Sequence, residues 1–200
     1  MALPLFPLST VLFPDGILPL RIFERRYLDM VKECARHEGE FVVCLIKNGN
    51  EVGQAAQHYK VGTACQIIDW ETLPDGLLGV TTQGVRRVQI NDTQTMPDQL
   101  QMGEIETISE EQDEELPARF SEWAQLLQEI IIKLGKPFDQ QLMQLTSAKW
   151  VGARLTEVLP IEADIKQRVL EIDQPLVRLE HLRESLKDIE YYYSRGNLNH

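Results

Sequence analysis

Glu24 lies within three residues of Arg21, Arg25 and Arg26, so it is a first candidate for acid–base chemistry. A general acid must hold its proton near neutral pH, whereas nearby guanidinium groups favour the ionised carboxylate. The neighbourhood therefore makes Glu24 a poor general acid. We expect Glu24 instead to hold Arg26 and the start of a helix together.

Ser147 and Lys149 carry the groups of a serine–lysine nucleophile pair, but their spacing does not place the amine on the hydroxyl. We expect an exposed Ser147 that caps a helix and an ordinary surface Lys149. The motifs GxxxxGK[ST], GxGxxG, HExxH and GxSxG do not occur in the sequence. The histidines are scattered over His37, His58, His181 and His200. The sequence therefore predicts no catalytic residue, and we expect neither ATP hydrolysis nor casein cleavage.

The acidic run Glu110, Glu111, Asp113, Glu114 and Glu115 is the main candidate for a cation site. Calcium loops alternate their oxygen ligands around a glycine, and this run has neither feature. Acidic residues at a helix N-terminus interact favourably with the helix dipole. We therefore expect a solvated cap on the helix that follows, with no metal and no cofactor.

Cys34, Cys44 and Cys65 form no CxxC pair and have no histidine at metal-ligand spacing. The apolar neighbours of Cys44 and Cys65 predict small core residues in a reducing compartment. Prolines interrupt residues 1–16 and no basic segment precedes them, which is not typical of a secretory signal. No run approaches the roughly 18 apolar residues of a membrane span. We expect a cytoplasmic protein with no membrane partner.

The net charge of −11 disfavours a nucleic-acid partner, because an acidic chain repels phosphate backbones. Neither residues 1–108 nor residues 109–200 contain an excess of basic residues. Arg86 and Arg87 are adjacent on an expected strand, so their side chains point to opposite faces. One is expected to line the barrel surface and the other to enter a salt bridge.

The pattern of the first half of the chain predicts a small β-barrel. A hydrophobic content of 43% supports a core, and 200 residues fit one large domain or two small ones. Short β-rich runs separated by turn signals are typical of a closed or nearly closed barrel. The expected strands are Leu3–Leu8, Ile17–Ile22, Phe41–Lys47, Val61–Glu71, Leu77–Gln83, Val85–Asn91 and Gln101–Ile108. One helix, Glu24–His37, presents Tyr27, Met30, Val31 and Cys34 on one face.

After residue 109 the apolar period lengthens to that of a helix. Ser109–Gln112 can be read as a capping box for a helix whose apolar stripe runs from Phe120 to Leu134. The other expected helices are Phe138–Leu145, a helix capped by Ser147 that ends near Leu159, Glu162–Ile172, and a long helix from Pro175, with Leu176, Leu179, Leu182, Leu186 and Ile189 in its stripe and Gly196 past its end. We place a barrel lobe at residues 1–110 and a helical bundle of about five helices at residues 111–200.

The sequence resembles the N-terminal, substrate-binding domain of Lon proteases. The resemblance rests first on LPLFPLSTVLFPDGILPLRIFERRY at residues 3–27. Further matches are FVVCLIKNG at 41–49, EVG at 51–53, YKVGT at 59–63, GVRRV at 84–88, LTEVLP at 155–160 and KQRVLEI at 166–172. Arg25 departs from the proline that the family often has before Arg-Tyr. The matches extend over nearly the whole chain.

The resemblance implies a PUA-like β-barrel followed by helices, which is the α+β class. It also implies a stand-alone protein without the ATPase and peptidase modules of Lon proteases, so no catalytic residue is carried over. We expect the prolines, glycines and aromatic residues of the matching segments to be structural: Pro7 and Pro14 at strand ends, Gly53, Gly62 and Gly84 in tight turns, and Phe13, Phe23 and Tyr27 as core bulk.

The leading hypothesis is a non-enzymatic binding module that recognises polypeptide segments or a protein partner. A PUA-like RNA-binding domain is the alternative, and an enzyme acting on a small molecule comes third. The recognition surface is expected on the barrel or in a cleft between the lobes. We expect an apolar patch or groove with acidic surroundings. The sequence identifies neither the residues of that surface nor the oligomeric state.

Overall fold

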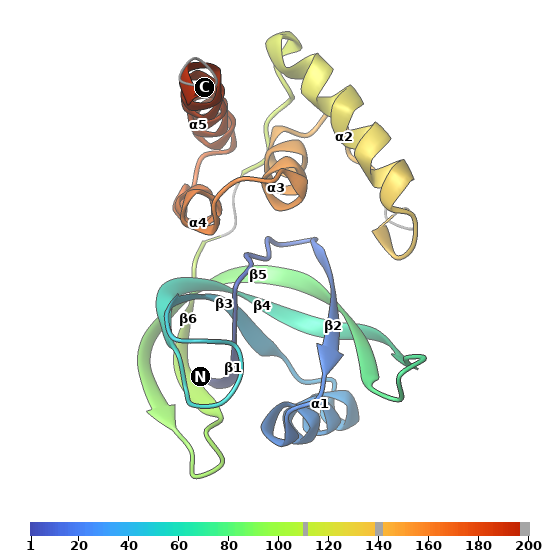
Figure 1. Ribbon diagram of the computed structural model, residues 1–200, viewed down its shortest axis with the longest axis vertical. Coiled ribbons are helices and arrows are strands. Elements are labelled where there is room, and N and C mark those ends of the chain that lie inside the picture. Colours follow the sequence, from blue (N-terminus) through green and yellow to red (C-terminus); the bar gives the residue numbers. More distant parts are fainter. Residues whose placement is uncertain (110–111, 139–141, 197–200) are drawn as a thin grey trace. The chain divides into compact units, whose positions relative to one another are not determined.

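The protein forms two compact units, which are described separately. The computed structural model describes residues 1–109, 112–138 and 142–196, with side chains as far as residue 187 (Figure 1). The barrel unit comprises Met1–Glu110 with Ile131–Leu142, and the helical unit comprises Glu111–Ile130 with Met143–His200. The boundary of independent domains at residue 110 stays a prediction.

Six strands form one mixed sheet that closes on itself. They are β1 (Ala2–Leu8), β2 (Ile17–Ile22), β3 (Phe41–Asn48), β4 (Gln57–Thr72), β5 (Leu78–Thr95) and β6 (Gln101–Thr107). The order is β2-β5-β4-β3-β1-β6, and β5 also pairs with β6, so all strands except β2 belong to a closed ring. β1 runs parallel to β3, and the other pairs are antiparallel. The expected barrel is confirmed, and β2 lies outside the ring, paired on one side.

β4 and β5 form a long hairpin whose turn is the predicted Pro74-Asp75-Gly76, where Gly76 has a φ of 82°. The expected strands Leu77–Gln83 and Val85–Asn91 are parts of the single strand β5, so the prediction of seven strands is wrong. The register on β4 shifts between Gly84 and Arg86, which leaves Val85 as the extra residue of a β-bulge. A bulge bends a strand without ending it. The alternation of apolar and polar residues is therefore interrupted at Val85, although β5 remains paired with β4 on both sides of it.

Gly62 and Gly84 lie within β4 and β5, so the prediction that they form tight turns is wrong. A Cβ on Gly84 would lie 2.2 Å from the carbonyl oxygen of Phe13, and one on Gly62 would lie 2.6 Å from that of Val43. Glycine within a strand often marks such a close approach of two backbones. Gly53, by contrast, has a φ of 94° in the loop after β3, as expected for a turn glycine.

Two apolar cores lie on opposite faces of β1 and β3, because side chains alternate along a strand. One core contains Leu3, Leu5, Val42 and Cys44, and the other contains Phe6, Leu8, Phe41 and Val43. The helix α1 (Arg25–His37) packs against the second core through the predicted face of Tyr27, Met30, Val31 and Cys34. All three cysteines are buried and free, as expected.

The first helix after the barrel strands begins later than predicted. A 3-10 turn, η1 (Ala118–Phe120), leads into α2 (Ser121–Leu134), and residues 112–117 are not helical. The prediction of a helix start near Ser109 is therefore wrong, and Pro117 precedes the first turn. Glu110 and Glu111 lie outside the described residues.

The described part of the acidic run caps a different helix from the expected one. Asp113 Oδ1 accepts a hydrogen bond from the Ser147 hydroxyl at 2.8 Å and from the Lys149 N–H at 3.2 Å, at the start of α3 (Ala148–Val158). Ser147 is the predicted N-cap, since its Oγ accepts from the Trp150 N–H at 2.9 Å. It is buried, which corrects the expected exposure, because Asp113 and the bridge from Glu115 cover it. A long-range contact of this kind is not visible in a local pattern.

The remaining helices are α4 (Ala163–Glu171) and α5 (Pro175–Gly196), close to their predicted bounds. Gly196 is the last residue of α5 and does not lie beyond it. Residues 142–145 are not helical, and 139–141 and the side chain of Ile189 lie outside the described residues. The described residues thus contain four α-helices after the barrel, where about five were expected. Among the described helices, none has the length and hydrophobicity that a membrane span requires. The α+β class is confirmed.

Candidate functional site

A mainly apolar groove in the barrel unit lies beside β2. Its volume is about 360 Å³, and it is lined by Phe6, Leu8 and Thr10, by residues 18–24, by Tyr27 and by Glu51. Three segments therefore meet there: β1 with Thr10 in the loop that follows it, β2 with the start of α1, and the loop after β3. We call this cavity the β2 groove.

The floor of the β2 groove is the edge of an apolar core. Phe6, Leu8, Leu20, Ile22 and Tyr27 all belong to the core under α1 and are all buried. Since that core is closed on its other sides by β3 and α1, the groove exposes its remaining apolar edge. The lining is therefore largely apolar, as is typical of ligand-binding cavities.

Phe23 is the exposed apolar residue of the groove. Its exposed fraction is 54%, so the prediction that it adds core bulk is wrong, whereas Phe13 and Tyr27 are buried as expected. Phe23 follows the last residue of β2, where the chain turns into α1. In the alternation of β2, Ile22 points into the core and the following side chain therefore points outward. This position holds a large aromatic ring beside the cavity.

The charged residues of the groove leave an acidic excess. Arg21 forms an ion pair with Asp75, and Glu24 forms one with Arg26. Glu51 Oε1 accepts a hydrogen bond from the Ser9 N–H at 2.6 Å, and no ion pair to Glu51 occurs within the described residues. One carboxylate charge at the groove is thus left without a cationic partner in that part of the chain.

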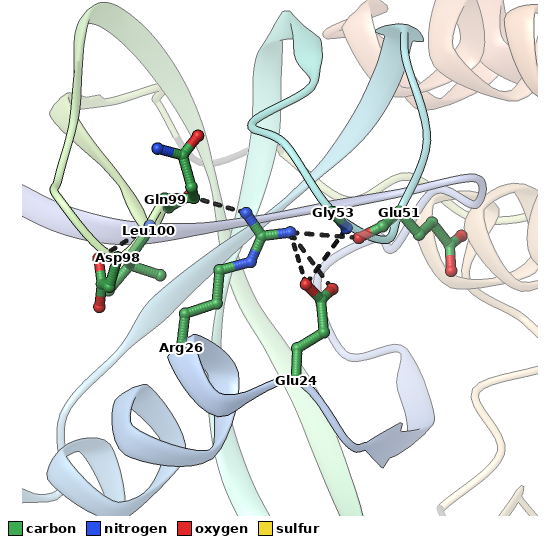
Figure 2. Close-up of polar contacts among 7 residues, drawn as sticks. All are labelled: Glu24, Arg26, Glu51, Gly53, Asp98, Gln99 and Leu100. Atoms are coloured by element: carbon green, nitrogen blue, oxygen red, sulfur yellow. Dashed lines mark hydrogen bonds and ion pairs between the residues drawn. The ribbon is translucent and has the colours of Figure 1, made fainter.

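Arg26 ties together three loops next to the groove (Figure 2). Its guanidinium donates to the Gln99 carbonyl oxygen at 2.8 Å, to the Glu51 carbonyl oxygen at 3.5 Å and to Glu24 Oε1 at 3.2 Å. Glu24 Oε2 also accepts from the Gly53 N–H at 3.3 Å. The prediction that Glu24 holds Arg26 is confirmed by their ion pair. Glu24 is also the N-cap residue of α1, but its carboxylate makes no capping hydrogen bond to the helix, so the expected side-chain hold on the helix start is not present. This pair positions the loop that carries Glu51.

Tyr27 presents a neutral hydroxyl group to its surroundings. Burial raises the pKa of Tyr27 to about 12, and the nearby Arg26 opposes this in part. The guanidinium carbon of Arg26 lies 4.6 Å from the centre of the Tyr27 ring. Tyr27 therefore contributes apolar surface and no charge at neutral pH.

The other residues singled out in the sequence have structural partners. The Ser147 hydroxyl is engaged by Asp113 and by the helix it caps, so it is not poised as a nucleophile. Arg86 forms a two-pronged ion pair with Glu40 at 2.6 and 2.7 Å, so the expected salt bridge is confirmed. Arg87 is buried, so the prediction that the other arginine lines the barrel surface is wrong. Neither arginine therefore leaves a free basic surface. Burial raises the pKa of the Cys44 thiol, which keeps it protonated. Within the described residues, no three His, Cys, Asp or Glu side chains are grouped as metal ligands would be.

The sequence did not identify the groove residues, although one signal was present. Leu18, Leu20 and Ile22 alternate with Pro19, Arg21 and Phe23, and only one of the two sets can enter a core. That alternation places Phe23 with the exposed set. The expected alternative, a cleft between the two lobes, stays a prediction.

Comparisons with known proteins all point to the same protein family. A family model described as the ATP-dependent protease La (LON) substrate-binding domain matches residues 2–188. Lon protease 1 of Syntrophobacter fumaroxidans is 26% identical over 188 residues, which are 90% of this chain and 23% of that protein. Lon protease 2 of Herpetosiphon aurantiacus is 28% identical over 191 residues, which are 91% of this chain and 23% of that protein. The chain spans about a quarter of the length of these curated relatives.

Solved structures agree with this match. The crystal structure of a Lon N-terminal domain protein from Xanthomonas campestris has a TM-score of 0.74 and 34% sequence identity, and the match covers 92% of this chain and 98% of that one. The N-terminal domain of Lon protease from the Mycobacterium avium complex shares the fold, with a TM-score of 0.64 and 16% identity over 94% of this chain and 99% of that one. Because the family model extends over nearly all of the sequence, the chain belongs to the Lon substrate-binding domain family.

Proposed function

We propose that this protein is a non-enzymatic binding module that holds an apolar polypeptide segment in the β2 groove. The observation that carries the proposal is an apolar cavity with the exposed ring of Phe23 beside it, next to the uncompensated carboxylate of Glu51. The family name refers to substrate binding, which supports a polypeptide as the ligand. The free, buried cysteines support a reducing compartment, and we propose the cytoplasm.

Apolar burial supplies the affinity in this proposal. Each Å² of apolar surface removed from water contributes about 25 cal/mol, before the cost of ordering the peptide is subtracted. The exposed half of Phe23 and the open edge of the core are the surfaces that a peptide side chain would cover. A largely apolar interface also makes the affinity only mildly sensitive to salt.

Charge sets the preference among apolar segments. Because Glu51 is unpaired within the described residues and the whole chain carries −11, a lysine or arginine flanking the apolar residues is favoured over an acidic one. The same charge disfavours RNA, whose phosphates need clustered basic residues. Arg21 and Arg86, two of the exposed or half-exposed bases, already hold carboxylates.

The first prediction compares two exposed apolar residues of the barrel unit. Phe23 is 54% exposed and lines the groove, whereas Ile68 on β4 is 49% exposed and does not line it. On an array of peptides with varied apolar and charged residues, Phe23→Ser should weaken binding at least about fivefold, since it removes an aromatic contact of the groove. Ile68→Ser should leave the binding unchanged.

The outcome that contradicts the proposal is specific. Equal losses in the two variants would assign binding to general surface hydrophobicity and not to the groove. Loss of all binding between about 50 and about 300 mM salt would assign it to charge alone.

A further inference from the structure

We propose that the polypeptide in the β2 groove binds as an added β-strand, hydrogen-bonded to the free edge of β2. This inference rests on the proposed function and names the conformation that the groove selects. The occupant is an extended segment that alternates apolar and polar residues and carries lysine or arginine near the apolar stretch. Three observations carry the inference: the phase of the β2 pairing, the position of the free edge at the groove, and the charges beside it.

The phase of the pairing shows which backbone groups of β2 face away from β5. The Gly84 N–H donates to the Gly16 carbonyl oxygen at 2.9 Å, and the Thr82 hydroxyl donates to the Leu18 carbonyl oxygen at 3.0 Å. Even-numbered residues of this segment thus direct their backbone groups toward β5. In an antiparallel ladder the intervening residues direct theirs to the opposite side. Those residues are Ile17, Pro19 and Arg21.

The free edge coincides with the groove at Pro19 and Arg21. Both residues line the cavity and both are exposed, whereas Ile17 is buried and is not part of the lining. β2 pairs with β5 alone, and no other described segment bonds to the backbone of these two residues. The carbonyl groups of Pro19 and Arg21 and the N–H of Arg21 therefore offer two acceptors and one donor along the groove.

The neighbouring surfaces complement an added strand. On such a strand, alternate side chains face the apolar edge of the core and the others face solvent. The apolar floor would accept one set of side chains, and the Glu51 carboxylate attracts a basic residue nearby. Peptide recognition by strand addition takes its affinity from main-chain hydrogen bonds and its preferences from pockets for alternate side chains.

Pro19 and Arg21 limit the length of the pairing. Pro19 has no N–H, and a proline or a charged residue on an edge strand resists long edge-to-edge association. An added strand can therefore form only a short ladder centred on Arg21. A short ladder supports weak, reversible binding and disfavours pairing of β2 with a second copy of the chain.

The test uses the full chain and the peptide KLTVKFTLK, acetylated, amidated and labelled with a fluorophore. Methylating single backbone nitrogens of the peptide removes one donor at a time. Strand addition predicts that two alternate central positions each lose about tenfold in affinity, while the position between them changes less than about twofold. If the parent peptide binds and methylation changes its affinity equally little at every position, strand addition is overturned, whereas the proposed binding function of the groove is retained. Failure of the parent peptide to bind overturns both.

A matched pair of protein variants isolates the donor on β2. Arg21→Ala and Arg21→Pro both remove the side chain that pairs with Asp75, but only proline removes the N–H. Relative to Arg21→Ala, Arg21→Pro should weaken the peptide about tenfold. Equal affinities of the two variants contradict the proposal.

If Arg21→Pro does not fold, amide hydrogen exchange of the unmodified protein tests the same N–H group directly. The Arg21 amide should be protected only when the peptide is added, and an unchanged exchange rate at saturating peptide overturns the proposal. Sedimentation velocity adds an independent check on the oligomeric state. If the chain forms a dimer that persists in Arg21→Ala and is lost in Arg21→Pro, the free edge of β2 binds a second copy of the chain, and the proposal is overturned.

Discussion

At the scale of single residues, the cluster around Arg26 decides how the groove is held. Arg26 is buried and reaches backbone oxygens of Gln99 and Glu51, while Glu24 binds the N–H of Gly53 (Figure 2). The loops that carry Gln99 and Glu51 therefore depend on one guanidinium. Such groups stabilise only as a complete set, because removing one partner leaves buried polar atoms unpaired.

This dependence predicts a large difference between two adjacent arginines. Arg26→Met should lower the free energy of unfolding by about 3 kcal/mol, because Glu24 and two backbone oxygens lose their partner. Arg25→Met should change it by less than about 0.5 kcal/mol, because the Arg25 side chain is mostly exposed and its ion pair with Asp29 lies on the surface. Urea unfolding followed by circular dichroism measures both. Equal stabilities of the two variants would show that the cluster does not hold the loops.

Residue roles were predictable where the partners are close in sequence. The Glu24–Arg26 pair and the Ser147 cap follow from local spacing, and both are present. Phe23 was expected in the core because its type is typical of core residues, yet the phase of β2 exposes it. Asp113 was expected to cap the helix that follows it, and its contact with Ser147 joins residues 34 positions apart. Type and local spacing do not encode such long-range contacts.

At the scale of elements, the long hairpin of β4 and β5 determines where the free edge lies. The later part of β5 pairs with β6 and so belongs to the closed ring. The first part of β5, from Leu78 to Gln83, pairs with β2, which lies outside the ring. The bulge at Val85 lies between these two parts. Gly84 stands next to the bulge, where the backbone of Phe13 comes closest. The hairpin therefore needs a residue without a side chain at this position.

The close approach at Gly84 predicts opposite effects of the same substitution at two glycines. Gly84→Ala should lower the free energy of unfolding by about 1–3 kcal/mol or more, since its Cβ would meet a backbone oxygen that cannot move freely. Gly152→Ala in α3, where the nearest atom would lie at an ordinary 3.4 Å, should be neutral or stabilising by up to about 1 kcal/mol. Thermal or urea unfolding gives both values. A stable Gly84→Ala variant would show that β5 can move away from Phe13.

Element types were predictable from periodicity, and element ends were less so. The strands, α1, α4 and α5 occur close to their expected ranges because a period of two or 3.6 continues along each. Two strands proved to be one, since a bulge interrupts the alternation without ending the pairing. The start of α2 was expected too early, because Ser109–Gln112 has the composition of a cap but 112–117 enters a bridge with the segment before α3 instead.

At the scale of the whole molecule, family membership and charge limit the class of function. The family model extends over residues 2–188, and the chain spans about a quarter of the Lon proteases it matches. The net charge of −11 and the paired state of Arg21 and Arg86 give little basis for an RNA-binding surface. A polypeptide ligand agrees with both the family name and the apolar groove. The sequence predicted the family through its resemblance, but the location of the groove needed the fold.

The most direct test of the account maps the peptide KLTVKFTLK onto the ¹⁵N-labelled full chain by NMR. We predict that the largest shifts fall on residues 18–24, on Tyr27 and on Glu51, which line the β2 groove. Another cavity of the barrel unit is lined by Cys34, Ile67 and Trp70, among others. Shifts centred on that cavity, or no shifts at saturating peptide, would contradict the assignment of the groove as the binding site.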